Sequence, residues 1–521
     1  MNKPLRRVGL TMMVMVLLLL ANLTYVQVIN ADTYANNPAN RRSVMEEYGR
    51  QRGQIVSATG TILANSVETK DAQHYLRVYK NGPEYAPVTG YYSSIFGATG
   101  IERAEDDVLN GSSSKLFVRR LSDLITGRDP RGGNVQLTVD PKTQDAAYAG
   151  MTAKNFSGAV VAIKPSTGEI LAMVSTPSFD PNPLASHDNA TQRDTITKLD
   201  DDPTKPALNR ATQETLPPGS TFKLVVASAA LANGIDDANT KNLPADPTIT
   251  LPGTSTTLSN FANETCPEGT NNQVSVSIAI EYSCNTAFST LAGKVGKDNL
   301  IQQAAKFGIG QTDLTVPVPV ATSTVGSIPD EAALYQSGIG QRDVKLTPIQ
   351  DAMVAATIAN GGVRMQPQLV KNILAPDMSS ISSFSPQEAP GGPALSKDVA
   401  DQVKAMMLLS EQHTGGAGKQ ANVKIASKTG TAEHGTDPKN TPPHAWYVAF
   451  APADNPQIAV CVVVENGGDR GLAATGSSVA AGVGRATINA YLAGEADDAH
   501  HRAVARRPLP AGSAHRRRRH G

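Results

Sequence analysis

Ser220 and Lys223 are the pair of side chains in this sequence best suited to covalent chemistry. Two prolines and a glycine at 217–219 would end any earlier element, and the apolar residues at 225–231 predict a helix that stops at Asn233-Gly234. Positions three apart share one face of a helix, so a lysine that burial has deprived of its proton could accept the serine proton. Taken alone, the pair also fits a serine N-cap and an unrelated surface lysine.

Two later motifs carry further polar groups. Ser283-Cys284-Asn285 precedes apolar residues of helical spacing at 288–295 and would place a hydroxyl and an amide at a helix start. Lys428-Thr429-Gly430 follows a short apolar run. On an edge strand the glycine would let a substrate backbone pair with the strand, and the ammonium and hydroxyl beside it suit a carboxylate. Individually, these motifs also fit a capped polar loop and a turn at a strand end.

The three motifs occur in the order Ser-x-x-Lys, Ser-x-Asn and Lys-Thr-Gly, about 60 and about 140 residues apart. This set is typical of penicillin-binding proteins and class A β-lactamases. Together with the stretches at 52–55, 158–173, 209–211, 338–341 and 428–433, it makes nearly the whole chain resemble a class B penicillin-binding protein, a membrane-anchored D,D-transpeptidase of bacterial cell-wall synthesis. Cys284 departs from the commonest residue of the second motif, at a position that carries no required chemistry.

The resemblance implies a role for each motif residue. Ser220 would be the nucleophile, acylated by the penultimate D-alanine of a peptidoglycan stem peptide, and Lys223 would take its proton. Ser283 would relay a proton to the leaving D-alanine with electrostatic support from Lys428. The substrate would be bound by Asn285, Thr429, Gly430 and Thr431, and the backbone N–H groups of Ser220 and Thr431 would form the oxyanion hole. The resemblance implies no cofactor and no metal.

Strands are predicted at both ends of the C-terminal two thirds of the chain, around a mostly helical middle. They are the apolar segments at 135–139, 158–163, 170–174, 446–449 and 457–464. Short turns join neighbouring strands as antiparallel hairpins, and Asp140-Pro141 predicts a helix start. The sequence therefore predicts an α+β fold, an antiparallel sheet with helices packed on it. The resemblance implies the fold that penicillin-binding transpeptidase domains share with serine β-lactamases.

An apolar segment near the N-terminus predicts a membrane anchor. Residues 8–29 suit one bilayer span, and the basic residues Lys3, Arg6 and Arg7 precede it, which predicts a cytoplasmic N-terminus with the rest of the chain outside. Bulky residues at 25–29 favour an uncleaved signal anchor over a cleaved signal peptide. We therefore expect a single-pass protein of the cell membrane.

Composition divides the remainder of the chain. We expect a cytoplasmic N-terminus at 1–7, the transmembrane anchor at 8–29, a small mixed N-terminal domain of pedestal or dimerisation type at 30–132, a transpeptidase domain at 133–493 and a disordered basic tail at 494–521. Within the N-terminal domain, residues 52–63 read as a hairpin.

The charge balance and the cysteines indicate which partners and which cellular compartment the protein has. The chain has 47 basic and 47 acidic residues, and this balance argues against nucleic-acid binding. The chain has three cysteines, which fits an exported protein. Because an oxidising compartment permits disulfides, we hypothesise that Cys266 and Cys284 form one. Cys461 lies in an apolar run and is predicted to be a buried thiol. No cluster of Cys and His has zinc-ligand spacing.

Two alternatives to a transpeptidase remain open at this point. A D,D-carboxypeptidase or β-lactamase of the same fold would need a base that activates water, and no second carboxylate stands in a recognisable hydrolytic motif. A non-catalytic β-lactam sensor or divisome scaffold would have a silent site, whereas all catalytic side chains are present. We therefore expect a D,D-transpeptidase, acting on D-Ala-D-Ala stem peptides and inhibited by β-lactams. Because little sequence precedes residue 132, a separate glycan polymerase and other division or elongation proteins are the expected partners.

Overall fold

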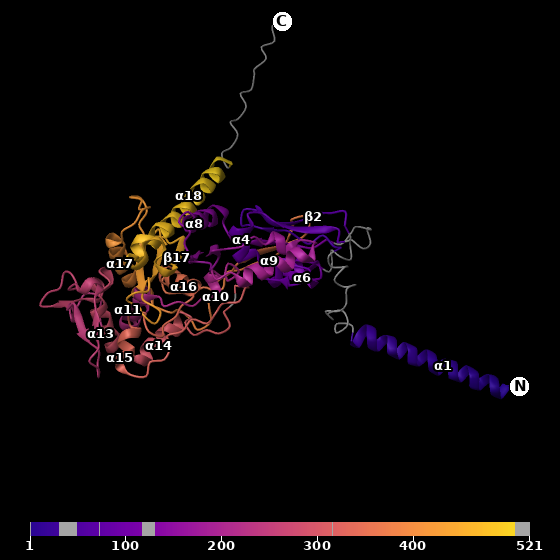
Figure 1. Cartoon of the computed structure of the whole chain (residues 1–521), viewed down its shortest axis with the longest axis horizontal. Coiled ribbons are helices and arrows are strands. Elements are labelled where there is room, and N and C mark those ends of the chain that lie inside the picture. The colour runs from indigo at the N-terminus through magenta and orange to yellow at the C-terminus, as the bar shows by residue number, and fades with distance from the viewer. Residues whose placement is uncertain (1, 31–48, 72, 117–130, 315, 506–521) are drawn as a thin grey trace, which may run out of the picture.

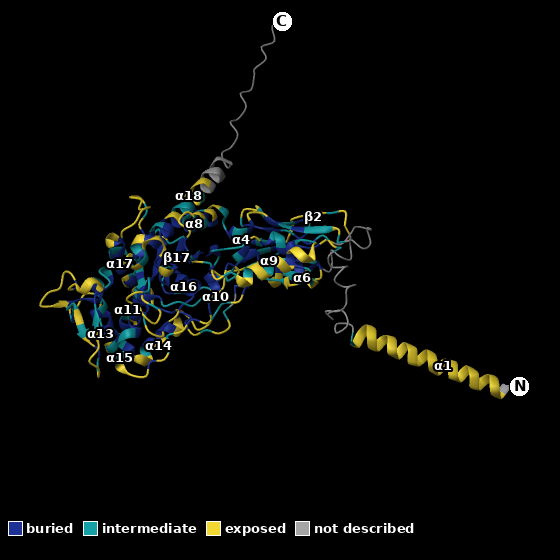
Figure 2. Cartoon of the chain, in the orientation of Figure 1, coloured by how far each residue is buried: buried dark blue, intermediate teal, exposed yellow. Residues whose placement is uncertain are grey.

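Two large β-sheets, one of five strands and one of six, organise the computed structural model (Figure 1). It describes residues 2–30, 49–71, 73–116, 131–314 and 316–505. Figure 2 shows that buried residues gather around these sheets, whereas helix α1 (Asn2–Thr24) is exposed along its length. The fold is α+β, as expected.

The five-stranded sheet is antiparallel and joins strands from distant parts of the chain. Its order is β15 (Ala426–Ala432), β16 (His444–Ala451), β17 (Ile458–Val464), β7 (Gly158–Ile163) and β8 (Ile170–Thr176). β17 and β7 pair from Ala459 opposite Ile163 to Val464 opposite Gly158. Helices cover both faces, which is why β7, β8, β16 and β17 are mainly apolar runs without alternation, whereas the outer strand β15 is polar. The predicted antiparallel arrangement of early and late strands is confirmed.

Different helices pack on the two faces of this sheet. α8 (Pro141–Thr152) and α18 (Ala481–Ala505) lie on one face, and α16 (Pro348–Ala359) lies on the other. Alternate residues of β16 point to the two layers, with Trp446 on the α16 side and Tyr447 on the α18 side. The predicted start of α8 is confirmed, because the carboxylate of Asp140 accepts a hydrogen bond from the Thr143 N–H group at 2.9 Å.

The predicted helix after Ser220 is also confirmed. A 3₁₀ turn, η4 (Gly219–Phe222), leads directly into α11 (Lys223–Ala232), and Gly234 follows with φ of +61°. Residues 223–230 are buried on every side, because α13 (Asn285–Val295), α14 (Lys297–Lys306) and α17 (Lys397–His413) pack around α11. The segment that carries the first motif is therefore a central helix of the domain.

The six-stranded sheet contains strands from both sides of residue 132. Its order is β14 (Ser380–Ser383), β13 (Val370–Leu374), β6 (Asn134–Leu137), β1 (Ile55–Val56), β2 (Ile62–Glu68) and β3 (Tyr75–Tyr79). β1 and β2 form the hairpin expected at 52–63. β1 runs parallel to β6, which pairs with β13 on its other side. The division of the chain at 132/133 stays a prediction.

A buried carboxylate lies beside this second sheet. Glu102 on α5 (Gly100–Ala104) is fully buried and accepts hydrogen bonds from Arg52 Nε and Arg77 Nε, each at 2.6 Å. Burial by itself raises the pKa of Glu102, but the two guanidinium groups outweigh it and lower that pKa below its ordinary value. Glu102 is therefore ionised and joins the strand β3 to the segment before β1.

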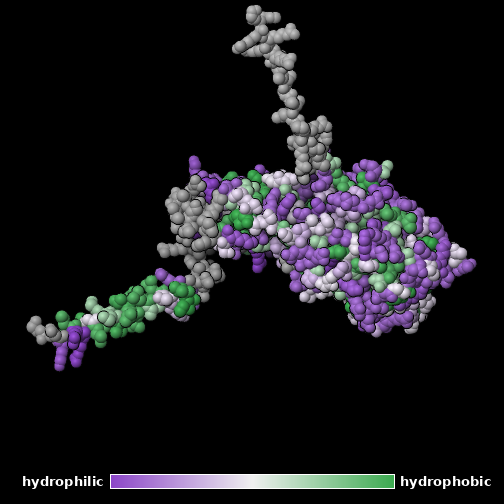
Figure 3. Space-filling model, turned by 180° about the vertical axis from the view of Figure 1, so that it is seen from behind, coloured by the Kyte–Doolittle hydropathy of each residue, from purple (hydrophilic) through white to green (hydrophobic). Residues whose placement is uncertain are grey.

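The two ends of the described chain differ from the rest. One helix, residues 3–29, is long and apolar enough to cross a membrane by length and composition, and Figure 3 shows it as a hydrophobic rod with hydrophilic residues at its N-terminal end. At the other end, the expectation that disorder begins at residue 494 is wrong for residues 494–505, which continue α18. This segment is rich in Ala, which favours helix propagation from a packed start. Residues 506–521, including the arginines 516–519, lie outside the described residues.

Candidate active site

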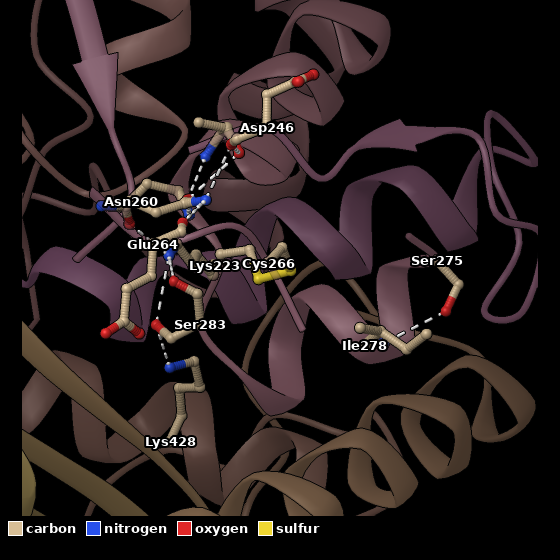
Figure 4. Close-up of a disulfide and its surroundings, with 12 residues drawn as sticks. Lys223, Asp246, Asn260, Glu264, Cys266, Ser275, Ile278, Ser283 and Lys428 are labelled. Carbon is tan, nitrogen blue, oxygen red and sulfur yellow. Dashed lines mark hydrogen bonds between the residues drawn. A yellow bond between two sulfur atoms is a disulfide. The ribbon is translucent and has the colours of Figure 1, made fainter. Parts of the chain in front are cut away.

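Residues of all three motifs converge on the hydroxyl of Ser283 (Figure 4). Lys428 on β15 donates a hydrogen bond from Nζ to Ser283 Oγ at 2.8 Å. Lys223 donates from Nζ to the Ser283 carbonyl at 2.7 Å, and its Nζ lies 3.3 Å from the same hydroxyl. A third bond runs from Lys223 Nζ to Asn285 Oδ1 at 2.7 Å. The Ser283 hydroxyl therefore lies between two amino groups, an arrangement able to pass a proton between them.

Ser220 lies one helical turn before Lys223, on η4. Gly219 has φ of +57°, its N–H group donates to the Gly340 carbonyl at 3.0 Å, and a Cβ at this position would lie 2.8 Å from the Thr431 carbonyl oxygen. The turn is thus held between the loop at Gly340 and β15. Ser220 is partly exposed, and its hydroxyl forms no hydrogen bond within the described part of the chain. Lys223 bonds Ser283 and Asn285 of the second motif in this structure, and the Ser220 hydroxyl is free to react with a bound molecule.

Burial changes the proton affinity of both lysines. Desolvation of the wholly buried Lys223, and then the neighbouring charge of Lys428, lower the pKa of Lys223 well below its usual 10.5. Burial also lowers the pKa of Lys428 to about 7. Because the two groups share one hydroxyl, they disfavour simultaneous protonation. One of them is therefore suited to act as a neutral general base near neutral pH.

The third motif lies on β15, the outer strand of its sheet, as the sequence analysis assumed. A Cβ on Gly430 would lie 2.5 Å from the Pro218 carbonyl oxygen, so glycine is what permits the Ser220 turn to lie against the strand. Thr429 and Thr431 are partly exposed, and neither hydroxyl bonds another residue in the ranges that the structure describes. Both hydroxyls are therefore available to an anionic group bound along the strand.

The second motif is positioned by Asn260, which the sequence analysis did not single out (Figure 4). Its Oδ1 accepts hydrogen bonds from the backbone N–H groups of Asn285 at 2.7 Å and Thr286 at 3.0 Å, at the start of α13. Its Nδ2 donates to the carbonyls of Asp246 and Glu264. One side chain thus joins a loop to the helix start that carries the motif, and no local sequence pattern identifies a contact of this kind.

Asn285 uses both ends of its amide inside the protein. Its Oδ1 accepts from Lys223, and its Nδ2 donates to the Ser259 carbonyl at 2.9 Å. In this structure Asn285 therefore orients the lysine, and its expected contact with a substrate amide stays a prediction.

The disulfide hypothesis is confirmed. Cys284, the middle residue of the second motif, is bonded to Cys266, and both cysteines are buried. The predicted buried thiol is confirmed as well, since Cys461 is free and fully buried on β17. The disulfide gives the second motif a covalent link to the preceding loop, in addition to the bonds of Asn260.

β15 is supported from behind by a buried polar network that the sequence analysis missed. Glu411 on α17 accepts hydrogen bonds from the Ser427 hydroxyl, from Tyr447 OH at 3.1 Å and from Arg485 Nε at 2.7 Å. Arg485, on α18, also donates to the backbone carbonyls of residues 414–417. Because Ser427 directly precedes Lys428 on β15, this network fixes the position of the backbone from which the Lys428 side chain extends. Its members lie 16 to 74 residues apart in sequence, which hides them from motif analysis.

The structure thus brings Lys223, Ser283, Asn285 and Lys428 into direct contact and places Ser220 and the threonines of β15 beside them. Within the described residues, no group of three His, Cys, Asp or Glu side chains could hold a metal ion. The site can perform acid–base and nucleophilic chemistry with its own side chains.

Comparison with known proteins places this site in a family. The profile of the penicillin-binding protein transpeptidase domain matches residues 158–489, and that of the penicillin-binding protein A dimerisation domain matches residues 52–135. A relative from Mycolicibacterium smegmatis, named peptidoglycan D,D-transpeptidase PbpA, is 52% identical over 497 residues, which cover 94% of this chain and 99% of the relative.

Solved structures show the same relationship. The penicillin G acyl-enzyme complex of penicillin-binding protein A from M. tuberculosis is 50% identical and has a TM-score of 0.81, covering 85% of this chain and 100% of its own. An acyl-enzyme complex of the same M. tuberculosis protein with a different β-lactam has a TM-score of 0.83 at 50% identity, covering 86% of this chain and 100% of its own. The resemblance drawn from the motifs is confirmed, and the chain belongs to the class B penicillin-binding proteins.

Proposed function

We propose that this protein is a peptidoglycan D,D-transpeptidase that cross-links stem peptides through a serine acyl-enzyme and is inhibited covalently by β-lactams. The observation that carries the proposal is the hydrogen-bonded row of Lys223, Ser283 and Lys428 beside the Ser220 hydroxyl, which bonds none of the residues that the structure describes. The names of the relatives, and the β-lactam acyl-enzyme complexes among the similar structures, support the same reaction.

In the acylation half-reaction, Ser220 Oγ attacks the carbonyl carbon of the penultimate D-alanine while Lys223 accepts the hydroxyl proton. Ser283, bonded to both lysines, passes a proton to the nitrogen of the terminal D-alanine as its C–N bond breaks. Lys428 supports this relay electrostatically. An amino group of a neighbouring stem peptide then attacks the ester carbonyl carbon and gives one proton to the same relay. The ester C–O bond breaks, and Ser220 Oγ takes back a proton from Lys223.

Substrate binding follows the edge of β15. Thr429 and Thr431 hold the terminal carboxylate, and Gly430 allows the substrate backbone to lie along the strand. The N–H groups of Ser220 and Thr431 stabilise the oxyanion, each donor contributing on the order of 3 kcal/mol in the transition state. Asn285 binds the substrate amide once its Nδ2 exchanges the Ser259 carbonyl for the substrate.

The N-terminal helix anchors the enzyme in the cell membrane. Its apolar length suits one span, and the preceding Lys3, Arg6 and Arg7 favour a cytoplasmic N-terminus with the catalytic part outside. A separate glycan polymerase supplies the strands, and proteins of division or elongation bind the N-terminal domain at 30–132, which precedes a transpeptidase domain at 133–493. The match of residues 52–135 to a dimerisation domain supports a contact surface there.

Intact mass of the full-length protein in detergent, before and after penicillin G, tests the nucleophile. We expect a stable adduct in the wild type and in Ser228→Ala, a control on α11, the helix that follows the Ser220 turn, and none in folded Ser220→Ala. No adduct on folded wild type would refute the acyl-enzyme. A transient adduct with released penicilloic acid would indicate a β-lactamase.

A second assay separates a transpeptidase from the remaining alternatives. The enzyme is given a stem peptide ending in D-Ala-D-Ala together with an acceptor stem peptide, and the products are identified by mass. A cross-linked product supports the proposal. Shortened peptide alone would indicate a D,D-carboxypeptidase, and acylation by penicillin without any peptide product would indicate a β-lactam sensor.

A further inference from the structure

A buried carboxylate that the reaction scheme does not use lies behind the nucleophile. Asp351, in the first turn of α16, is 1% exposed. Its Oδ2 lies 2.8 Å from Thr221 Oγ1, and its Oδ1 has no partner within the described residues. The N-cap of α16 is Thr347, four residues earlier, so Asp351 does not cap its own helix. The side chain of Asp351 is directed instead at the residue that follows Ser220.

The hydrogen bonds of Thr221 indicate the protonation state of Asp351. Thr221 Oγ1 lies 3.2 Å from the Pro218 carbonyl oxygen as well as 2.8 Å from Asp351, yet a hydroxyl has only one proton to donate. Both contacts become full hydrogen bonds if a neutral Asp351 donates to Thr221 and Thr221 donates to Pro218. If Asp351 were ionised, its unpaired oxygen would carry a large desolvation cost, because the side chain is buried. In agreement, burial raises the pKa of Asp351 to about 7, against the opposing bond of Thr221.

The two residues joined by this chain of bonds enclose Ser220. Pro218 lies two residues before the nucleophile, and its carbonyl oxygen would be only 2.5 Å from a Cβ on Gly430. Thr221 Cγ2 would be 3.2 Å from the same point. The turn therefore lies directly against the strand of Lys428. Loss of the Thr221 bonds would remove a polar constraint on the turn that carries Ser220.

We propose that Asp351 is a positioning residue for acylation: through the Thr221 hydroxyl, it holds the turn of Ser220 against β15. This inference rests on the proposed function, in which Ser220 is the nucleophile. It assigns to α16, a helix that contributes none of the three motifs, a role in the placement of the reacting oxygen.

The test measures how fast penicillin G acylates the full-length protein in detergent, with the acylation rate constant and the dissociation constant of the reversible complex determined separately. Asp351→Leu removes the bond to Thr221, whereas Asp351→Asn keeps a side-chain N–H donor for it. Thr221→Val removes the same bond from the other side and keeps the side-chain shape. Thr357→Val is the matched control, because it removes a buried hydroxyl of α16 that bonds only the Met353 carbonyl.

We expect Asp351→Leu to lower the acylation rate constant about 10- to 100-fold, the scale of a misplaced reacting group, with little change in the dissociation constant. Asp351→Asn should restore most of the rate. Thr221→Val should match Asp351→Leu, and the double variant should be no slower than either one, because both lose one shared bond. The control should keep the wild-type rate.

Three outcomes would overturn the inference: a wild-type rate in Asp351→Leu, an Asn variant as slow as the Leu variant, or additive losses in the double variant. If Asp351→Leu fails to fold, the acylation rate constant of Thr221→Val is the test, and a wild-type value in that variant overturns the proposal. A wild type that forms no adduct at all overturns the proposed function, and this inference with it.

Discussion

The protonation of Lys428 couples the site to folding. Burial lowers its pKa to about 7 from the usual 10.5. Between these values the unfolded chain binds a proton that the folded protein lacks, so the contribution of Lys428 to the free energy of unfolding rises with pH. We predict that the stability of the wild type relative to Lys428→Met increases between pH 7 and pH 9, by at most about 1.4 kcal/mol per pH unit.

Urea unfolding of both proteins at several pH values measures this difference. Lys424→Met is the control, since Lys424 is a well-exposed lysine just before β15 that pairs with Asp454 at the surface. A difference between wild type and Lys428→Met that stays constant or falls with rising pH would contradict the buried, easily deprotonated state of Lys428.

Among the elements, α17 and α18 support β15 through the ion pair of Glu411 and Arg485. Glu411→Gln leaves the fully buried Arg485 guanidinium without its carboxylate, which costs about 3–5 kcal/mol in comparable buried pairs. We predict a loss of this size in the free energy of unfolding, and slower acylation by penicillin G, because Ser427 loses its charged acceptor next to Lys428.

Asp401→Asn on the same helix is the matched control. Asp401 pairs with Lys397 and Lys404 near the surface, where such pairs contribute about 0–1 kcal/mol. Equal losses from Glu411→Gln and Asp401→Asn would mean that the buried network does not support the strand.

The disulfide gives a second prediction at the level of elements. Cys266 and Cys284 are 18 residues apart, and closing a loop of about this length stabilises the folded state by about 3 kcal/mol. The double variant with Ser at both positions should lose about this amount in urea unfolding and become insensitive to reductant. Cys461→Ala should remain sensitive to reductant, and a wild type whose stability does not change on reduction would contradict the prediction.

The elements that could be predicted from sequence are those whose cause is local. The helix after Ser220, the capped start of α8 and the strands β7, β8 and β17 follow from apolar runs, caps and turns within about ten residues. The motif residues could be predicted because their spacing is characteristic of a family. The end of α18 could not be predicted, because the polar and charged residues at 494–505 resemble a tail although the helix continues through them.

The side chains that position the motifs could not be predicted, because each depends on contacts across the fold. Asn260 reaches the helix start 25 residues later, Asp351 meets Thr221 across 130 residues, and Arg485 meets Glu411 across 74. In sequence each is an ordinary polar residue. The packing of α16, α17 and α18 around the sheet makes Asp351, Glu411 and Arg485 partners of the site, and the loop after β11 (Thr257–Ser259) brings Asn260 to the start of α13.

At the scale of the whole molecule, buried polar contacts connect the two sheets. Gln144 on α8 donates hydrogen bonds to the carbonyls of Glu84, on α4 (Gly82–Thr89), and of Met173 on β8. Asn209 donates to the Pro87 carbonyl of the same α4. In addition, β6 leads directly into α8, and β13 follows α16 in the chain. The N-terminal part and the catalytic sheet should therefore unfold as one cooperative unit.

Glu102→Gln tests this coupling from the end remote from the site. The change leaves the buried guanidinium of Arg77 without its carboxylate and removes one of the two carboxylates that pair with Arg52. By analogy with other buried pairs, the free energy of unfolding should fall by about 3–5 kcal/mol. We predict that heating the variant abolishes penicillin G binding and melts the bulk secondary structure at one common, lowered temperature. Asp497→Asn, which breaks an exposed pair with Lys142, should leave that temperature nearly unchanged. If penicillin binding instead survived a first, separate transition, the N-terminal sheet would be an independent unit, and strands β6, β13 and β14 would not couple it to the catalytic sheet.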